Sequence, residues 1–446
     1  MKKVVKFGGT SLANATQIKK VANILNADKD RNIIIVSAPG KRDSGDTKIT
    51  DLLISLYEKI NNEKEVNSIF STIKDRYIKI IEELNIDNGF KSEFSNELDK
   101  IFETSKTKQT KDFLASRGEY LNAKIIAKFL DAHFLDAQNL IIFKSNKKLN
   151  YELTYENLKR EIENLIKVDS SKKIVIPGFY GSFENGEIVT FSRGGSDITG
   201  SLVARAISAS LYENWTDVSG VLFTDPRIVK NPSPIEYITY TELRELSYMG
   251  ASVLHEDAIH PVSKIGIPIN ILNTNSPSDK GTMIVGKIPP NVKRKVVTGV
   301  AGKNGFYSIL LEKELMNEEV GFLANVLNIF KDENISVEHI PTGIDTLSVV
   351  VRKENVVNKE KLLDKIKNTL SLDNIKLEEE IALIAVVGEG IANEKYITRD
   401  IFDALYEEDI RVRMIDQDAS GINIIIGIYE KDYERAIKKL YENLNR

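Results

Sequence analysis

The alternation of apolar and polar positions divides this chain into two parts of different character. Up to about residue 286, short apolar runs alternate with helical stretches. The continuous β-branched run Ile33–Val36 suits a strand covered on both faces, and the spacing of Ile18, Val21, Ala22 and Leu25 is that of an amphipathic helix. Strands that alternate with helices predict an α/β domain whose open, mostly parallel sheet carries helices on both faces.

Between Asn61 and Lys111 the pattern is helical and charged, without a strand signal. We therefore expect a helical excursion beside the sheet. Downstream, Ser116–Glu119 is expected to head a helix over Tyr120–Leu130. Upstream, Thr50 is a candidate cap for the helix that runs to Tyr57.

The second part begins after Ile288–Asn291, the Pro-rich stretch that best fits a linker. Beyond it the order strand, helix, strand, strand, helix, strand is predicted twice, which is the ferredoxin-like unit. The second copy runs out of chain before its last strand, while the apolar stretch at 295–302 lies ahead of the first copy. We predict that this stretch completes the second unit, so that the domains are 1–287, 304–380 and 381–446 with strand 295–302.

Composition narrows the function classes. Of 446 residues, 42% are hydrophobic and 28% charged, as in globular proteins. The 61 basic and 65 acidic residues are mixed along the chain, which leaves no basic face for nucleic acid or a membrane surface. The absence of cysteine excludes disulfides and thiolate chemistry, and the four histidines lack zinc-ligand spacing. We expect a soluble, cytoplasmic protein without a signal peptide or membrane span.

The candidate chemistry lies in glycine-rich turns that follow strands. The first, Lys6–Ser11, reads as a strand end, two glycines and a helix start, an arrangement that points backbone N–H groups at an anion. An ordinary βα turn is the alternative. Two further turns, Gly194-Gly195 and Gly220, follow later strands. None fits the Walker, Rossmann or protein-kinase patterns. Several turns at one sheet edge suit phosphoryl transfer, which needs positioning and charge neutralisation.

Four motifs together carry a resemblance to a known family. They are Lys6-Phe7-Gly8-Gly9-Thr10-Ser11, Ser116-Arg117-Gly118-Glu119, Gly194-Gly195-Ser196-Asp197, and Thr216-Asp217-Val218 with Thr224-Asp225-Pro226-Arg227. In order and spacing the chain resembles the aspartate kinases of the amino-acid kinase family, and its terminal repeat resembles their tandem ACT domains. The resemblance implies transfer of the ATP γ-phosphate to the β-carboxylate of L-aspartate, the first step toward lysine, threonine and methionine.

The same resemblance assigns the catalytic roles. Lys6 would bridge the transferring phosphoryl group, and Glu119 would hold its ammonium and contact the substrate amine. Arg193 would bind the α-carboxylate in a forked geometry, and Ser196 and Asp197 would lie near the phosphates and Mg²⁺. The substrate carboxylate is itself the nucleophile, so no strong general base is required.

Each assignment has a plainer alternative. Ser37 and Thr50 match hydroxyl positions for aspartate, but Thr50 is also a possible helix cap. Glu119 would otherwise be a first-turn helix acid and Asp197 a cap, and Arg193 a surface side chain. No protein metal site is expected, since Mg²⁺ would arrive with ATP.

The nucleotide positions show two departures from the family pattern. Ser252 stands where many members have the lysine of Lys-Val-Leu-His-Pro, and Leu222 stands where a tyrosine is frequent. The residues that match the nucleotide positions are Lys6, Gly8, Gly9, Ser11, Thr216, Asp217, Leu222, Arg227, Ser252 and Val253.

For the ACT domains the resemblance implies an amino-acid effector, lysine before threonine, and at least a homodimer. The helix start at Gly321–Ala324 would offer N–H groups to an effector carboxylate, although Phe322 and Leu323 also read as plain core residues. The matching effector positions are Met316, Gly321, Phe322, Leu323, Ser336, Val337, Glu338 and Asn423.

Two rival functions follow from the sequence. An amino-acid kinase for glutamate or N-acetylglutamate is disfavoured by the tandem ACT pattern and by Ser116–Glu119. A non-catalytic amino-acid sensor that lost turnover through Ser252 is disfavoured because Lys6, Glu119, Arg193 and Asp197 are all present.

Overall fold

A computed structural model describes residues 2–108, 110–192, 194–251 and 254–445. The chain divides into two compact units. The first unit comprises Met1–Val221, Glu236–Tyr240 and Val253–Ile288, and the second comprises Leu222–Ile235, Thr241–Ser252 and Pro289–Arg446.

The first unit is built on an eight-stranded sheet of order β3-β5-β2-β1-β8-β10-β11-β9. All neighbouring strands are parallel except β10 and β11, so the predicted open, mostly parallel sheet is confirmed. The sequence analysis did not predict β3, β9 and β11, which are only two to four residues long. The strands are β1 Lys3–Phe7, β2 Arg31–Val36, β3 His133–Phe134, β5 Ile174–Pro177, β8 Leu211–Thr216, β9 Tyr237–Thr239, β10 Ile269–Asn273 and β11 Thr282–Val285.

The first unit also contains a smaller sheet of order β4-β6-β7. Its strands are β4 Ile142–Phe143, β6 Tyr180–Phe183 and β7 Ile188–Thr190. The Asn185-Gly186 turn joins β6 to β7 as an antiparallel hairpin.

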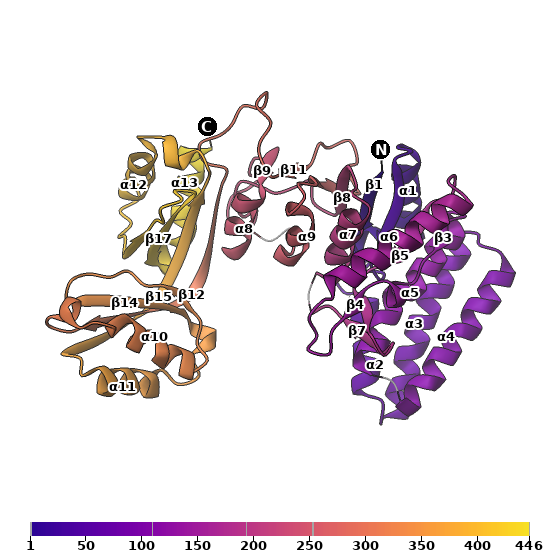
Figure 1. The fold of residues 1–446 in the computed structure, drawn as a ribbon, viewed down its shortest axis with the longest axis horizontal. Helices are drawn as coiled ribbons and strands as arrows, with labels where there is room; N and C mark the ends of the chain where they lie inside the picture. The colour runs from indigo at the N-terminus through magenta and orange to yellow at the C-terminus, as the bar shows by residue number, and fades with distance from the viewer. Residues whose placement is uncertain (1, 109, 193, 252–253, 446) are drawn as a thin grey trace. The chain divides into compact units, whose positions relative to one another are not determined.

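Helices connect and cover these strands (Figure 1). The excursion between Asn61 and Lys111 is helical as predicted and forms α3 and α4, which pack on each other. The helices of this unit are α1 Ala15–Asn26, α2 Ile49–Glu58, α3 Glu63–Glu83, α4 Asn88–Lys108, α5 Lys111–Phe129, α6 Tyr151–Val168, α7 Gly195–Ala206 and α9 Ile259–Ser263. Helix α8, Tyr240–Tyr248, belongs to the second unit apart from its first residue.

Two helix boundaries differ from the sequence prediction. Helix α5 begins at Lys111 with Thr110 as its N-cap, because the Thr110 side chain accepts from the Phe113 amide. Glu119 therefore lies in the middle of a helix, and the interpretation as a first-turn acid was wrong. Helix α2 begins at Ile49 after Lys48, which makes no side-chain cap bond, so Thr50 is inside the helix and does not cap it.

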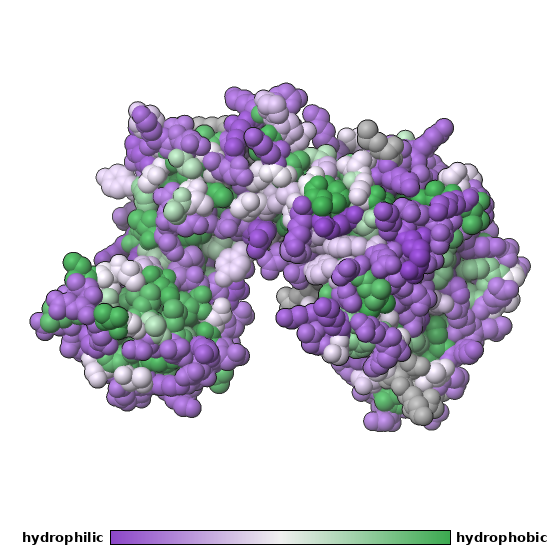
Figure 2. Space-filling model, in the orientation of Figure 1, coloured by the Kyte–Doolittle hydropathy of each residue, from purple (hydrophilic) through white to green (hydrophobic). Residues whose placement is uncertain are grey.

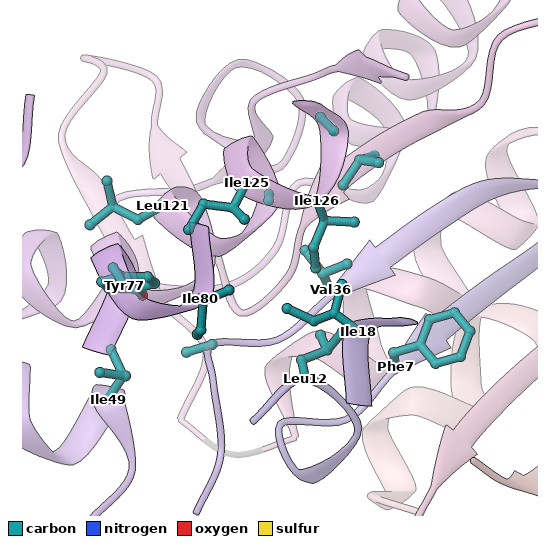
Figure 3. Close-up of a cluster of buried hydrophobic side chains, with 14 of the residues drawn as sticks. Phe7, Leu12, Ile18, Val36, Ile49, Tyr77, Ile80, Leu121, Ile125 and Ile126 are labelled. Atoms are coloured by element: carbon teal, nitrogen blue, oxygen red, sulfur yellow. The ribbon is translucent and has the colours of Figure 1, made fainter. Parts of the chain in front are cut away.

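The sheet keeps two different faces. Val5, Phe7, Ile34 and Val36 point into an apolar core shared with α1, α3 and α5. Figure 3 shows Phe7, Leu12, Ile18 and Val36 in this core, together with side chains of α3 and α5 such as Tyr77 and Ile125. Because strand side chains alternate, Lys6 points to the opposite face, where α7 packs on β1 and β8. This alternation lifts Lys6 out of the apolar core.

The second unit contains a six-stranded sheet of order β13-β14-β12-β15-β17-β16. The sequence predicts separate strands before and after residues 303–305, but in the structure they form one long strand, β12. In the same way, the strands predicted before and after residue 380 form one long strand, β15. The elements are β12 Gly299–Glu312, α10 Phe322–Asp332, β13 Val337–His339, β14 Thr346–Arg352, α11 Lys359–Leu370, β15 Asn374–Val387, α12 Ile397–Glu407, β16 Met414–Asp416, β17 Asn423–Tyr429 and α13 Tyr433–Leu444.

The six-stranded sheet consists of two four-stranded halves, and β12 and β15 each contribute a segment to both halves. The later part of β12, from Phe306, pairs with β14 and with the start of β15, while Gly299–Lys303 pairs with Leu383–Val387 of β15. The second half of β15 in turn pairs with β17. The register of the β12–β15 pair shifts between Lys303 and Ser308 of β12. Each half has the strand order of a ferredoxin-like unit, and each has its own apolar core under two helices.

Candidate active site

The carboxyl end of β1 carries an ion pair between a strand and a helix start. Lys6, 8% exposed, places its Nζ 2.6 Å from Oδ1 of Asp197. Helix α7 begins at Gly195, after Gly194 in the left-handed conformation (φ 59°), and Asp197 is its third residue. Asp197 is thus not a cap, and its carboxylate binds the ammonium of Lys6. Among the described residues no ion pair joins Lys6 to Glu119, contrary to the expectation from the sequence.

The first glycine turn is engaged by its neighbours. The Gly8 amide donates to the Trp215 carbonyl oxygen at 3.0 Å, which extends the β1–β8 ladder by one residue. That amide is therefore not available for a phosphate. Gly9 accepts from the Gly40 amide at 2.8 Å, and a Cβ on Gly40 would meet the Gly9 carbonyl carbon at 2.4 Å. Only glycine permits this close approach of the loop after β2 to the turn after β1.

Glu119 lies in a buried position on α5. Its side chain is 5% exposed, its carboxylate accepts from the Ala38 amide, and its Oε2 has no hydrogen-bond partner among the described residues. Desolvation by burial raises the pKa of Glu119 to about 8, although the bond from Ala38 opposes the shift. The neighbouring Gly118 allows α5 to pack tightly on Ala38, since a Cβ there would lie 2.8 Å from the Ala38 Cβ.

One carboxylate oxygen of this buried acid thus makes no hydrogen bond with the described residues. A carboxylate is costly to bury unless it is paired, and a raised pKa is typical of such positions in functional sites. Glu119 can take up the charge of an ammonium group that enters from the carboxyl edge of the sheet.

The loop after β2 is held by a residue that the sequence analysis missed. Arg76 of α3, 4% exposed, donates to the carbonyl oxygens of Gly40 and Thr47, the latter at 2.7 Å, and lies 3.2 Å from Asp46 Oδ2. Asp46 also binds the Arg42 guanidinium, whose hydrogen bonds hold the pKa of Asp46 well below its usual range. The sequence did contain one signal for this contact. Arg76 lies on the same face of α3 as the apolar residues Ile73 and Ile80, where a charged side chain needs a buried partner.

The other predicted substrate residues are Ser37, Thr50, Ser196 and Arg193, and the structure describes the first three. The Ser37 carbonyl oxygen accepts from Asn122 Nδ2 at 2.7 Å, and Thr50 is partly exposed near the start of α2. Ser196 is buried against Gly178 at the end of β5, where a Cβ would lie 2.6 Å from its Oγ. Arg193, expected to bind the α-carboxylate, lies outside the described residues.

The predicted nucleotide positions fall into both units. Ser11 is buried and its hydroxyl shares a hydrogen bond of 2.7 Å with Thr274, so it is occupied by the protein. Thr216 ends β8, and its hydroxyl donates to Asp217 at 3.2 Å. Ser252 and Val253 lie outside the described residues.

Leu222 and Arg227 belong to the second unit. They line a hollow of about 460 Å³ together with Pro226, Ile228, Lys230, Asn231 and Pro232. The Arg227 guanidinium pairs with Asp225 at 2.6 Å and is otherwise exposed, which leaves its remaining donors accessible to solvent.

The predicted effector residues lie in the second unit, most of them around the start of α10. Gly321 precedes α10 with φ 86°, Phe322 is buried below it, and Leu323 is 42% exposed. Met316 is buried, whereas Ser336 is exposed at the approach to β13. Phe322 is therefore a core residue, and Leu323 is not.

Glu338 and Asn423 both contact α8. Glu338 of β13 accepts from Arg352 Nε at 2.8 Å and from the Tyr248 hydroxyl, while its neighbour Val337 is half-buried. Asn423 lies in the other half of the sheet and donates to Glu245 at 2.6 Å. Since Tyr248 and Glu245 are both on α8, this helix touches a predicted effector position in each half.

The described part of the chain lacks a membrane-spanning helix and a cluster of metal-binding side chains. No helix is both long and apolar enough to cross a bilayer. Over the same residues, no three His, Cys, Asp or Glu side chains gather where they would hold a metal ion.

Comparison with known proteins gives matches along the whole chain. The model of the amino acid kinase family matches residues 1–273, and an ACT domain model matches residues 384–444. Aspartokinase 3 of Bacillus subtilis is 36% identical over 452 residues, covering 99% of this chain and 98% of that protein. Aspartokinase 1, chloroplastic, of Arabidopsis thaliana is 30% identical, covering 99% and 79% respectively.

Comparison with solved structures also gives aspartate kinases. The aspartate kinase of Clostridium acetobutylicum superposes with a TM-score of 0.91 at 46% identity, over 99% of this chain and all of that one. Aspartokinase III of E. coli in complex with aspartate and ADP gives a TM-score of 0.78 at 26% identity, and its complex with lysine and aspartate gives 0.77, each over 100% of both chains.

Proposed function

The chain belongs to the aspartokinases of the amino acid kinase family, and from this premise we propose which residues carry its reaction and its regulation. It is an aspartate kinase, an allosteric enzyme that phosphorylates aspartate, with an amino acid kinase domain followed by ACT domains. In the proposed reaction an oxygen of the aspartate β-carboxylate forms a bond to the γ-phosphorus of ATP. The bond to the bridging oxygen breaks, and ADP leaves with the electron pair.

The observation that carries this proposal is the buried Lys6–Asp197 pair at the carboxyl edge of the parallel sheet. Ligands of open α/β sheets bind at this edge, and a positioned ammonium stabilises the charge of a transferring phosphoryl group. We assign that role to Lys6. Asp197 holds the Lys6 ammonium at 2.6 Å until the phosphates arrive. Mg²⁺ bound to ATP supplies further charge neutralisation, and Asp197 is the acid of this pair that would face it.

Aspartate recognition is assigned to the other side of the same edge. Glu119 is assigned to the substrate ammonium, because its Oε2 accepts no hydrogen bond from the described residues and its buried carboxylate would gain a partner there. Ser37 and Thr50, at the end of β2 and the start of α2, are the proposed hydroxyl contacts, together with Ser196. Arg193 is the proposed partner of the α-carboxylate.

The nucleotide assignment is partly changed by the structure. Gly9, Thr216, Asp217, Leu222 and Arg227 stay as proposed ATP contacts, as do Ser252 and Val253. Gly8 and Ser11 are assigned to shaping the turn, because the Gly8 amide and the Ser11 hydroxyl are already bonded within the protein.

For regulation we propose lysine as the effector, bound where α10 begins and near Glu338. E. coli aspartokinase 3, 27% identical over 464 residues, is described as lysine-sensitive, and a crystal structure of aspartokinase III of E. coli contains lysine. Threonine is the second candidate. The proposed residues are Met316, Gly321, Phe322, Leu323, Ser336, Val337, Glu338 and Asn423.

We also propose the domain division 1–287, 304–380 and 381–446, with strand 295–302 completing the last. The pairing of Gly299–Lys303 with Leu383–Val387 supports it. A homodimer through the ACT domains is supported by exposed apolar side chains around α10, visible as a green area in Figure 2. They are Leu315, Val320, Leu323, Leu327 and Ile344. We propose a cytoplasmic location as well.

One assay tests substrate and effector together. The full chain is incubated with ATP·Mg²⁺ and hydroxylamine, which traps an acyl phosphate as a hydroxamate. L-Aspartate should give the signal, L-glutamate and N-acetylglutamate should not, and lysine should suppress it. A signal with glutamate alone would contradict the substrate. No signal with any acid, together with lysine binding, would support an amino-acid sensor without turnover.

A further inference from the structure

Asn214 of β8 lies directly beside Lys6. The parallel register of β1 and β8 pairs Lys6 with Asn214, so their side chains leave the sheet on the same face. Asn214 is 3% exposed and lies below the edge at which ligands would bind. None of the sequence motifs includes it.

The Asn214 amide contacts both members of the ion pair. Its Nδ2 donates to Asp197 Oδ1 at 2.9 Å, and its Oδ1 accepts from Lys6 Nζ at 3.4 Å. Lys6 Nζ and Asp197 Oδ1 are themselves 2.6 Å apart. Only one orientation of the amide satisfies both contacts, with the nitrogen toward the carboxylate and the oxygen toward the ammonium. A cation, an anion and a neutral amide therefore form a closed triangle.

The residues next to Asn214 on β8 make different contacts, so the contact with the Asp197 carboxylate is specific to Asn214. Tyr212, two positions earlier on β8, donates to the main-chain oxygen of Asp197 at 3.1 Å and so holds the helix start. Glu213 points to the other face, where Lys3 and Arg31 bind it at 3.2 and 2.8 Å. Among the described charged groups, Lys6 and Asp197 are thus the two that contact the Asn214 amide.

The triangle has a consequence when Lys6 turns to a phosphoryl group. Asp197 then loses its counter-charge, and a buried carboxylate without a donor is costly. The Asn214 amide remains bound to Oδ1, so the carboxylate keeps its direction. The amide oxygen likewise offers Lys6 a second acceptor, which is weaker than a carboxylate and easier to leave.

We propose that Asn214 is a positioning residue for phosphoryl transfer, which directs the Asp197 carboxylate and leaves the Lys6 ammonium free to move to the transferring group. This inference rests on the roles proposed above for Lys6 and Asp197. A neutral amide suits the place, because it is both donor and acceptor and adds no charge to the pair.

Two variants test the proposal. Asn214→Leu removes both polar contacts at similar volume, and kcat in the hydroxamate assay is expected to fall about 10- to 100-fold, the effect of one hydrogen bond to a charged group. KM for aspartate should change less than kcat, because Asn214 does not touch the Glu119 side of the site.

Asn214→Asp is isosteric but donates to Asp197 only while the new carboxyl keeps its proton. Its kcat, taken as a ratio to the wild-type value at each pH between 6 and 9, is expected to rise as the pH falls. A merely structural role would leave this ratio flat. Tyr212→Phe is the matched control, because it removes a hydrogen bond to the main chain of Asp197 and not to its carboxylate, so its ratio should stay flat.

The outcomes are distinguishable. If Asn214→Leu folds and keeps more than a third of the wild-type kcat, or if the Asn214→Asp ratio does not vary with pH, the positioning role is wrong. Should Asn214→Leu fail to fold, the isosteric variant decides alone. Lys6→Ala is measured beside them: if it keeps its rate, the proposed function itself is wrong, whereas loss of that rate with active Asn214 variants refutes the positioning role only.

Discussion

Arg76 of α3 donates through its buried guanidinium to the carbonyl oxygen of Gly40, the residue that rests on Gly9. The excursion of helices beside the sheet thus reaches back to the loop over the first glycine turn. The same guanidinium binds Thr47 and Asp46, so it holds that loop at three places.

Arg76→Met should therefore weaken aspartate binding more than turnover. Loss of these bonds frees the loop that precedes Thr50, and KM for aspartate is expected to rise about tenfold, as for one charge-assisted hydrogen bond. Steady-state kinetics with varied aspartate measure this. Arg160→Met is the control, because Arg160 is exposed on α6 and pairs with its neighbour Glu161. An unchanged KM in a folded Arg76→Met protein would show that the loop does not need this anchor.

Lys6→Ala should abolish turnover with the fold intact. In the proposed reaction its ammonium is the positioned cation at the phosphoryl group, and losing such a group lowers kcat by about 10²- to 10³-fold. Hydroxamate formation measures the rate, and circular dichroism checks the fold. Lys19→Ala, in an exposed position of α1, should keep the wild-type rate. More than about a tenth of the wild-type kcat in Lys6→Ala would contradict the assignment, given the size of such effects.

If Glu119 binds the substrate ammonium as proposed, aspartate binding should depend on pH. With a pKa of about 8 the carboxyl is mostly protonated at pH 7, and it must lose that proton to bind an ammonium group. KM for aspartate should accordingly fall by about five- to tenfold per pH unit from 6 to 8 and then level off. The Glu119→Gln variant should bind aspartate weakly at every pH, without this slope. A wild-type KM that is constant over the range would contradict the role.

Glu119 should also make the stability of the fold depend on pH. A rise in pH should strengthen aspartate binding but lower the free energy of unfolding. An unfolded glutamate ionises near its ordinary value of 4.5, whereas folded Glu119 holds its proton up to about 8. The folded state binds more protons between these values, so the free energy of unfolding should decrease as the pH rises from 4.5 to 8. Urea unfolding of wild type and Glu119→Gln at pH 6 and 8 should show the smaller decrease in the variant. An equal decrease in both would contradict the assigned cause.

Glu338→Gln should reduce inhibition by lysine while leaving the uninhibited rate unchanged. The carboxylate is the buried acid of the proposed effector position, and its loss removes an anionic partner for an effector ammonium. The lysine concentration for half-inhibition is expected to rise about tenfold or more. Glu354→Gln is the matched control, because Glu354 also lies near Arg352, at 3.8 Å, but is exposed. Equal inhibition in wild type and Glu338→Gln would place the effector elsewhere.

Val320→Glu combined with Leu327→Glu should dissociate the proposed dimer. Val320 is 99% exposed, and apolar side chains that cluster this openly near α10 are typical of an interface. Light scattering coupled to gel filtration would show the monomer mass for the variant. Val168→Glu, an exposed apolar position on α6, should leave the wild-type mass unchanged. A wild-type chain that is already monomeric would contradict the proposal directly.

The sequence pattern was sufficient for the architecture and for the position of Lys6, since buried strands and glycine turns leave strong local signals. It placed Glu119 at a helix start because the cap at Thr110 was overlooked, and a helix boundary is set by such single side chains. Asn214 was missed although β8 carries two adjacent polar residues, Glu213 and Asn214, in a central strand. Polar neighbours in a buried strand need partners on both faces, and those partners come from distant parts of the chain.

The fused strands have a consequence for how such an enzyme can be recombined. The half that contains β13 and β14 enters and leaves through β12 and β15, which are neighbours in one sheet, and residues with positive φ, Gly305 (92°) and Glu380 (59°), mark the two crossings. An exchange of chain at these two points would swap a complete half as a cassette and keep the other half covalently continuous. Such an exchange would move the proposed effector residues from Met316 to Glu338 as one segment, and both junctions fall at residues with positive φ.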